Sequence, residues 1–219
     1  KHKANLGLAY DGDADRLIAV DENGNIVDGD HIMVLSAIHL KNKGKLAQDT
    51  LVVTVMSNIG LTIAAKEHGI NLATTAVGDR YVLEEMKNSG YNLGGEQSGH
   101  MIFLDYNTTG DGVLSSLVLA QIVLEEGKNL SELAAVMTQY PQVLVNARIK
   151  NENKNRYMEY PEIKYEIERI EKLLDGCGRV LVRPSGTEPL VRVMLEGKEE
   201  GQIKELATNL ANLIQEKLS

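Results

Sequence analysis

The sequence predicts a mixed α/β domain followed by a smaller α+β domain. Before residue 139, short apolar segments rich in β-branched residues alternate with longer segments of helical periodicity. After "QYPQ" (139–142) the order changes to one strand, a helix, two strands and a final helix. The composition, 43% hydrophobic and 25% charged over 219 residues, is typical of a globular protein with a sizeable core.

Strands and helices are expected to alternate through the first part. "LGLAY" and "RLIAVD" read as short apolar strands, and the Asn-Gly pair in "DENGN" is typical of a hairpin turn. Asp28 or Asp30 can cap the first helix, which Gly44 ends. The later elements are expected at 50–56 (strand), 58–69 (helix), 71–77 (strand), 79–90 (helix), 101–104 (strand), 111–126 (helix) and 131–137 (helix). This alternation indicates a mainly parallel sheet.

The second part is expected to form a β-α-β-β-α unit. Its strands are placed at 143–149, 179–183 and 190–197, and its first helix at 162–174. The final helix, 199–217, has one apolar stripe, made of Ile203, Leu206, Leu210, Leu213 and Ile214. A segment of this size with its own apolar stripe fits a small separate domain.

Charge and cysteine content disfavour several classes of protein. The formal net charge of −8 argues against nucleic acid as a partner, because its phosphates need a basic surface. No apolar run approaches the roughly 18 residues of a membrane span. Cys177 is the single cysteine and cannot form an internal disulfide, so a reducing compartment, the cytoplasm, is expected.

Three aspartates at alternate positions follow the first strand in "YDGDADR". Asp11, Asp13 and Asp15 offer hard oxygen ligands on a tight turn, which suit Mg²⁺, or Ca²⁺ in a roomier site. Arg16 adds a guanidinium that can hold an anionic oxygen with two parallel hydrogen bonds. A cation beside an arginine is what a transferring phosphoryl group requires. The pattern therefore predicts a metal-assisted site for phosphoryl transfer.

Three alternatives to this interpretation remain. An EF-hand loop would match the three aspartates and Glu22, but Arg16 stands where that loop needs glycine for its sharp turn. A phosphatase with an aspartate nucleophile also has an Asp-x-Asp pair after a strand, but a third aspartate followed by arginine is not expected there. A solvated acidic turn is the simplest alternative, because motif matches carry false positives.

A second anion-binding pattern lies in "RVLVRPSGTEPLVR" (179–192). Arg183 ends one strand and Arg192 lies on the next, so an arginine stands on each side of the turn. Ser185 and Thr187 offer hydroxyls, and Gly186 helps to shape a turn whose N–H groups can converge on an anion. The pattern predicts a phosphate cradle, with a hairpin bearing solvated arginines as the alternative.

Two further segments are predicted to be loops, and their residues alone do not indicate a functional site. "LGGEQSGH" carries Glu96, Ser98 and His100 among glycines that permit close backbone approach. "AVGDRYV" carries Gly78 and Asp79 between a strand and a helix. Such polar groups suit sugar hydroxyls, but a lone histidine is more often structural than catalytic.

Taken together and in order, "YDGDADR", "VGDRY", "GGEQSGH" and "RPSGTEPLVR" resemble the α-D-phosphohexomutases over nearly the whole chain. "GEQSGH" and "DYNTTGDG" are most similar to the bacterial branch that acts on glucosamine phosphates. The resemblance implies four domains around a central cleft. Residues 1–27 would be the end of domain 2 with the metal loop, 28–140 domain 3, and 141–219 domain 4. The family's nucleophile, a phosphorylated serine in a Ser-His-Asn-Pro-type loop of domain 1, has no counterpart here.

The resemblance also implies a role for each matching residue. The metal ligands for Mg²⁺ would be Asp11, Asp13 and Asp15. The catalytic residues would be Arg16, which steadies the transferring phosphate, and His100, which lies close to it. The sugar-facing residues would be Gly78, Asp79, Glu96 and Ser98. The phosphate not undergoing transfer would be held by Arg183, Ser185, Gly186, Thr187 and Arg192.

The implied reaction is an isomerisation of a phosphosugar that serves cell-wall precursor synthesis. The phosphoserine would donate its phosphoryl group to a sugar monophosphate, and the resulting 1,6-bisphosphate would turn over and return the other phosphate. The chain is expected to be the C-terminal part of the enzyme and inactive alone. A mutase acting on glucose or mannose phosphates, and a non-catalytic metal- or sugar-phosphate-binding module, are the alternatives. The sequence leaves open whether the full-length enzyme is a homodimer and this chain a monomer.

Overall fold

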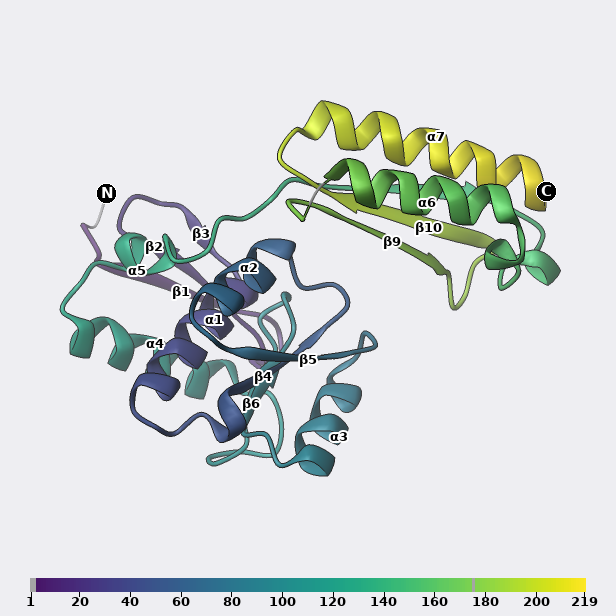
Figure 1. Ribbon diagram of the computed structural model, residues 1–219. Helices are drawn as coiled ribbons and strands as arrows, with labels where there is room; N and C mark the ends of the chain where they lie inside the picture. The colour runs from purple at the N-terminus through teal and green to yellow at the C-terminus, as the bar shows by residue number, and fades with distance from the viewer. Residues whose placement is uncertain (1–2, 175) are drawn as a thin grey trace. The chain divides into compact units, whose positions relative to one another are not determined.

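The protein, described here from a computed structural model over residues 3–174 and 176–219, folds as two compact units (Figure 1). The units divide between Gln139 and Tyr140. Each has a hydrophobic core of its own.

The first unit begins with a small antiparallel sheet in the order β1-β2-β3. Its strands are β1 (Leu6–Tyr10), β2 (Leu17–Asp21) and β3 (Ile26–Val27). The expected turn after β2 is present, with Asp21 accepting the N–H groups of Asn23 and Asn25 at 2.9 and 2.8 Å. Short connections of this kind permit only antiparallel pairing, so the parallel arrangement expected for the first part does not extend to these strands.

The main sheet of the first unit has four strands in the order β5-β4-β6-β7. They are β4 (Thr50–Thr54), β5 (Asn71–Thr75), β6 (Leu93–Gly95) and β7 (Met101–Phe103). β4 pairs in parallel with β5 and β6, because α2 (Ile59–Glu67) and α3 (Asp79–Ser89) provide the crossovers. β7 is antiparallel to β6, since only residues 96–100 join them. The sheet is therefore mixed.

The sequence predicts a loop at 93–95, and this prediction is wrong, because β6 lies there. Glycine normally weakens a strand, which is why its sequence does not indicate one. Here α3 packs so closely that a Cβ on Gly94 would lie 2.9 Å from atoms of Met86, Val52 and Val82. Close packing requires glycine at this position.

The remaining helices of the first unit are α1 (Gly29–Asn42), α4 (Gly112–Glu126) and α5 (Leu130–Ala134), with a 3₁₀ turn at Ala47–Asp49. α1 contacts α4, α5 and the main sheet, and α4 contacts β2 and β7, so these helices join the two sheets into one core. No helix in the described part of the chain is long and apolar enough to cross a membrane.

The second unit confirms the predicted β-α-β-β-α order. Its strands β8 (Gln142–Arg148), β9 (Arg179–Pro184) and β10 (Leu190–Glu196) form an antiparallel sheet in the order β8-β10-β9. α6 (Pro161–Leu174) and α7 (Glu200–Leu218) lie side by side over this sheet (Figure 1), and 3₁₀ turns at Asn151–Asn153 and Tyr157–Glu159 precede α6. Val191, Val193 and Leu195 belong to the core beneath the helices. Because strand side chains alternate, Arg192 faces away from the helices.

Asp28 holds the start of α1. Its carboxylate accepts the N–H of His31 at 3.2 Å and lies 2.7 Å from His31 Nδ1. Burial raises the pKa of Asp28, but the hydrogen bonds and charge of His31 outweigh burial, so the pKa lies below its usual value. The carboxylate is thus stabilised in its ionised form.

Asp28→Ala is expected to lower the free energy of unfolding by about 1–2 kcal/mol at neutral pH, because the helix loses its cap and His31 loses its partner. Urea unfolding measures this, and Asp28→Asn, which keeps a capping oxygen, should cost less. Because the pKa of Asp28 is lower in the folded protein than in the unfolded chain, the ionised carboxylate stabilises the fold at pH values above the unfolded pKa of about 4. This stabilisation is lost as the pH falls through the pKa of Asp28 in the folded protein. A difference between wild type and Asp28→Ala that stays constant down to about pH 2 would contradict this account.

Candidate active site

The loop between β1 and β2 gathers the three aspartates. Asp11, Asp13 and Asp15 each place one carboxylate oxygen within 4.8 Å of the other two. The Ala14 N–H donates to the Asp11 carbonyl at 3.2 Å, and Ala14 has a φ of 57°, a left-handed conformation that is uncommon outside glycine. This tight turn brings alternate carboxylates together.

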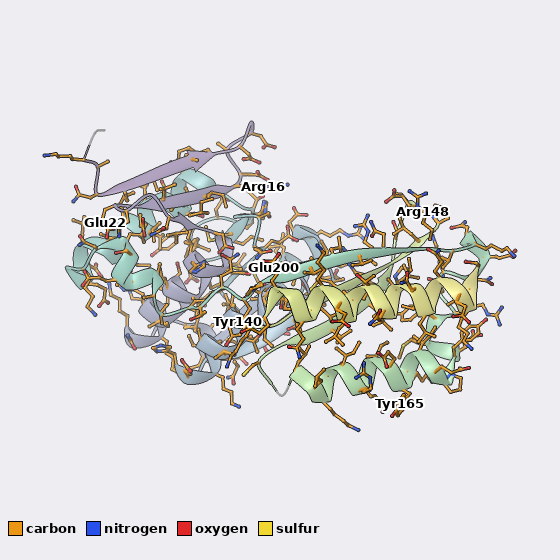
Figure 2. The ribbon with its side chains drawn as sticks, turned by 90° about the horizontal axis from the view of Figure 1, so that it is seen from above. Arg16, Glu22, Tyr140, Arg148, Tyr165 and Glu200 are labelled. Carbon is orange, nitrogen blue, oxygen red and sulfur yellow. The ribbon has the colours of Figure 1, made fainter. Side chains whose placement is uncertain are left out.

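Arg16 lies against this cluster, near the end of the β1–β2 hairpin (Figure 2). Its N–H donates to Asp11 Oδ1 at 3.2 Å, and its Nε lies 3.5 Å from Asp11 Oδ2 and 3.8 Å from Asp15 Oδ1. Half of the side chain is exposed, at 51%. Its terminal Nη groups make no hydrogen bond among the described residues, so they remain able to hold an anionic oxygen.

His100 connects the cluster to the main sheet. Its Nδ1 lies 2.9 Å from Asp15 Oδ2, and its Nε2 accepts the N–H of Gly110 at 3.2 Å. The backbones of Arg16 and His100 also form an antiparallel bridge. The structure therefore brings together the two residues predicted to be catalytic and the three predicted metal ligands.

The two sugar-facing loops predicted from the sequence contact each other. The Gly78 N–H, at the start of α3, donates to Glu96 Oε1 at 3.0 Å. Asp79 Oδ2 lies 3.9 Å from His100 Nε2. Ser98 is exposed. Gly78, Asp79, Glu96 and Ser98 therefore belong to one group of loops beside the aspartates, at the edge of the first unit's sheets.

The aspartate cluster fits a hard divalent cation. It offers carboxylate oxygens only, which are the ligands that Mg²⁺ and Ca²⁺ prefer. Asp15 Oδ1 is buried and accepts no hydrogen bond within the described part of the chain. A buried carboxylate oxygen without a donor is costly unless a cation approaches it. The structure thus contains an oxygen that a cation would satisfy.

The predicted phosphate cradle lies on the second unit's sheet, on the face away from the helices. Arg183 on β9 is the register partner of Arg192 on β10, so two like charges stand opposite each other. Burial, and then the charge of Arg192, lower the pKa of the Arg183 guanidinium. An anion between the two arginines would remove this repulsion.

The turn between β9 and β10 is shaped by its serine. Ser185 is almost fully buried, and its Oγ accepts the N–H of Glu188 at 3.2 Å. Gly186 and Thr187 are exposed. Arg192 makes an ion pair with Glu188 at 3.2 Å, which gives it a local counterion. The serine hydroxyl therefore folds the turn, and the exposed part of the cradle comes from the residues around it.

Two residues of these sites were not identified from the sequence. Lys154 lies in a segment interpreted only as a polar loop, yet its Nζ donates to the Ser185 carbonyl at 3.2 Å and adds a cation to the cradle. Gly110 donates to His100, and a Cβ there would overlap the His100 ring. "DYNTTGDG" carries the only sequence signal for Gly110, whereas nothing in the sequence near Lys154 indicates its partner.

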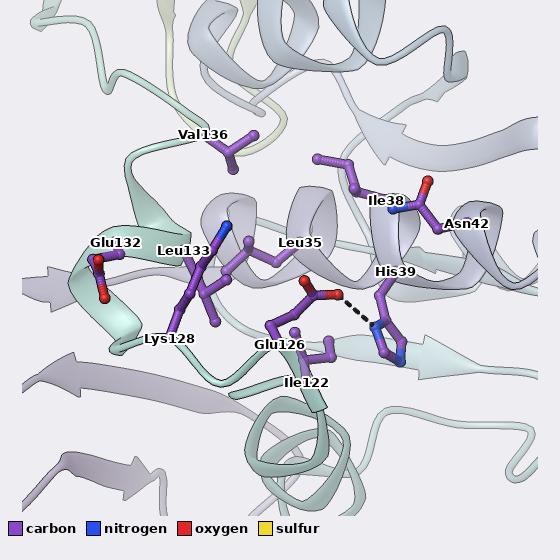
Figure 3. A pocket seen from close by; sticks show the side chains of 10 residues that line it. All are labelled: Leu35, Ile38, His39, Asn42, Ile122, Glu126, Lys128, Glu132, Leu133 and Val136. Atoms are coloured by element: carbon purple, nitrogen blue, oxygen red, sulfur yellow. Dashed lines mark ion pairs between the residues drawn. The ribbon is translucent and has the colours of Figure 1, made fainter. Parts of the chain in front are cut away.

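A pocket of about 170 Å³ lies apart from these residues, among α1, α4 and the segment around α5 (Figure 3). It is lined by Leu35, Ile38, His39, Asn42, Ile122, Glu126, Lys128, Glu132, Leu133 and Val136. His39 is already paired with Glu125 at 3.2 Å and Glu126 at 3.7 Å. None of the predicted site residues lines it, so this pocket does not belong to the candidate site.

Comparison with known proteins gives two family matches. Residues 28–140 match the phosphoglucomutase/phosphomannomutase α/β/α domain III, and residues 144–213 match the C-terminal domain of the same family. The phosphoglucosamine mutase of Clostridioides difficile strain 630 is 84% identical over the whole chain, and that of Caldanaerobacter subterraneus subsp. tengcongensis is 64% identical. The chain spans 49% of the length of each, about half.

Among solved structures, the fold is similar to that of an Aspergillus fumigatus N-acetylphosphoglucosamine mutase determined with GlcNAc-6P and magnesium. The TM-score is 0.78 at 23% identity, and the match covers 97% of this chain and 49% of that one. At this identity the likeness concerns the fold.

Proposed function

The chain belongs to the phosphoglucomutase/phosphomannomutase family, and on that premise we propose that it is the C-terminal half of a phosphoglucosamine mutase. The whole enzyme would be an isomerase that interconverts glucosamine 6-phosphate and glucosamine 1-phosphate. It would do so through a phosphoserine, supplied by the other half, and a 1,6-bisphosphate intermediate. Two relatives that carry this name, at 84% and 64% identity over the whole chain, support the choice of sugar.

The main support for the proposal is that one chain carries two separate sets of residues that can bind anionic phosphate oxygens. The first combines an oxygen-only ligand set with Arg16, and the second sets Arg183 opposite Arg192. A mutase that moves phosphate between two ends of a sugar needs both a reactive site and an anchor. We assign residues 1–27 to the end of domain 2, 28–140 to domain 3 and 141–219 to domain 4, and the family matches support this division.

The aspartate loop would act on the transferring phosphoryl group. Asp11, Asp13 and Asp15 would hold Mg²⁺, which when bound neutralises charge on phosphoryl oxygens. Arg16 would bind one of those oxygens through its Nη groups, because half of its side chain is exposed. These residues would not react covalently themselves. They would position the phosphoryl group and neutralise its charge, which supply most of the catalysis of phosphoryl transfer.

The cradle would bind the phosphate that is not being transferred. Arg183 and Arg192 would share it, with Gly186 and Thr187 at the exposed turn, and Ser185 would keep the turn in shape. The ion pair between Arg192 and Glu188 would open as the phosphate takes the place of the carboxylate. Such a site would bind the phosphate group and make no contact with the sugar, so it could accept the phosphate at either end of the bisphosphate. Gly78, Asp79, Glu96 and Ser98 would contact the sugar.

Full-length enzyme assayed on the 6-phosphates of glucosamine, glucose and mannose is expected to turn over the glucosamine compound with the highest kcat/KM. The 219-residue chain alone should show no turnover, because the phosphoserine lies in the other half. A clear preference for glucose or mannose phosphate would replace the proposed sugar with that one. Turnover by the chain alone would contradict the proposed division of the enzyme.

A further inference from the structure

We propose that His100 is a positioning residue of the metal site, and that its Nδ1–H holds the Asp15 carboxylate so that Asp15 Oδ1 faces the cation. The inference rests on the proposed function in one respect, because it takes the aspartate loop to be a divalent-cation site. It assigns to His100 a task that acts through Asp15.

The tautomer of the neutral His100 ring follows from its two hydrogen-bond partners. The Gly110 N–H donates to Nε2 at 3.2 Å, and a nitrogen that accepts a hydrogen bond carries no proton of its own. In the neutral ring the proton then lies on Nδ1. Asp15 Oδ2 is 2.9 Å from Nδ1, so the N–H donates to this carboxylate oxygen.

The two oxygens of Asp15 therefore have different surroundings. Oδ2 accepts from His100, whereas Oδ1 is buried and accepts no hydrogen bond from any described residue. Arg16 Nε, at 3.8 Å, lies beyond hydrogen-bond distance of Oδ1. Because Oδ2 is held by a donor, Oδ1 is the oxygen left for a cation. Arg16 Nε lies 3.5 Å from Asp11 Oδ2 and 3.8 Å from Asp15 Oδ1, and Asp15 has one carboxylate oxygen within 4.8 Å of oxygens of Asp11 and Asp13.

The ring itself is held firmly. His100 is 5% exposed, its carbonyl accepts the Glu96 N–H at 2.9 Å, and its backbone bridges Arg16. The ring packs against the backbone of Gly110 so closely that no Cβ fits there. A ring held by burial, by backbone hydrogen bonds and by packing against Gly110 can keep a ligating carboxylate in one orientation, as outer-shell partners of metal ligands do.

Mn²⁺ binding to the 219-residue chain, measured by the electron paramagnetic resonance signal of free Mn²⁺, tests the inference. His100→Ala is expected to weaken Mn²⁺ affinity about 10-fold, the size of effect that loss of an outer-shell partner has on metal sites. His100→Asn should restore affinity to within about threefold, because the Asn Nδ2 group occupies the place of the ring Nδ1 and can donate to Asp15. His100→Gln, whose amide lies nearer the place of Nε2, should not restore it.

His39→Ala is the matched control, because His39 is also a buried histidine paired with carboxylates of the first unit. It should change thermal stability and leave Mn²⁺ affinity unchanged. The inference is overturned if His100→Ala binds Mn²⁺ within twofold of wild type, or if His100→Asn binds as weakly as His100→Gln. The second comparison decides the matter even if the alanine variant fails to fold.

Asp13→Asn separates this inference from the metal site on which it rests. If Asp13→Asn loses Mn²⁺ and His100→Ala does not, only the role of His100 is wrong. If Asp13→Asn binds Mn²⁺ as wild type does, the aspartate loop is not the metal site and both proposals fail.

Discussion

Asp13→Asn in the full-length enzyme is expected to lower kcat by about 10³-fold, equivalent to about 4 kcal/mol of transition-state stabilisation. Asp11 is engaged by Arg16 and Asp15 by His100, whereas Asp13 is exposed and makes no hydrogen bond or ion pair in the described part of the chain. Its carboxylate is therefore free for a cation, and asparagine keeps its size while removing its charge. The substrate KM should change little, because the cradle provides the anchor.

Steady-state kinetics over a range of Mg²⁺ concentrations measures this effect, and raising Mg²⁺ should recover part of the lost turnover. Glu67→Gln is the control for the loss of one surface charge, because Glu67 is an exposed carboxylate at the end of α2. A turnover of Asp13→Asn within threefold of wild type at limiting Mg²⁺ would contradict the role of the aspartate loop.

Arg183→Ala is expected to weaken binding of glucosamine 6-phosphate to the full-length enzyme about 10–100-fold, since a charge-assisted hydrogen bond to phosphate contributes about 1.5–3 kcal/mol. The same change should leave the free energy of unfolding equal or slightly higher. Arg183 stands opposite Arg192 on adjacent strands, and like charges in that relation are destabilising. Loss of binding without loss of stability is the expected signature of an arginine kept for a ligand.

Arg169→Ala provides the matched control for this variant. Arg169 lies in the same unit and is paired with Glu166 on α6, so its loss should not affect substrate affinity. Calorimetry for binding and urea unfolding for stability give both readouts. If Arg183→Ala binds as wild type does, or if it is destabilised while Arg169→Ala is not, the arginine has a structural role instead.

Much of the fold was predictable, because it depends on local patterns. Apolar segments bounded by turns predicted β4 and β10. Asp28 or Asp30 was expected to cap the first helix, and Asp28 caps α1. β6 was not predictable, because glycine is unfavourable in strands. Gly94 is needed there because α3 packs closely against it, and this contact between distant segments leaves no local pattern in the sequence. The antiparallel pairing of β7 also depends on β6, because β7 has no other neighbour in the main sheet among the described residues.

The candidate site was predictable where ligands lie close together in the sequence. Asp11, Asp13 and Asp15 share one turn, and the spacing of Arg183 and Arg192 across a hairpin places them opposite each other. Contacts between distant segments were not predictable. His100 meets Asp15 across 85 positions and Lys154 meets Ser185 across 31, and each partner is set by the tertiary fold.

Nuclear magnetic resonance of the ¹⁵N-labelled 219-residue chain during addition of glucosamine 6-phosphate tests the phosphosugar assignment most directly. Residue-resolved amide signals report where a weak ligand binds, and no turnover is required. We expect the backbone signals of residues 185–188 and the Nε–H signals of Arg183 and Arg192 to shift with a common saturation curve. Signals that stay in place up to high ligand concentration, or shifts confined to other parts of the chain, would contradict the assignment.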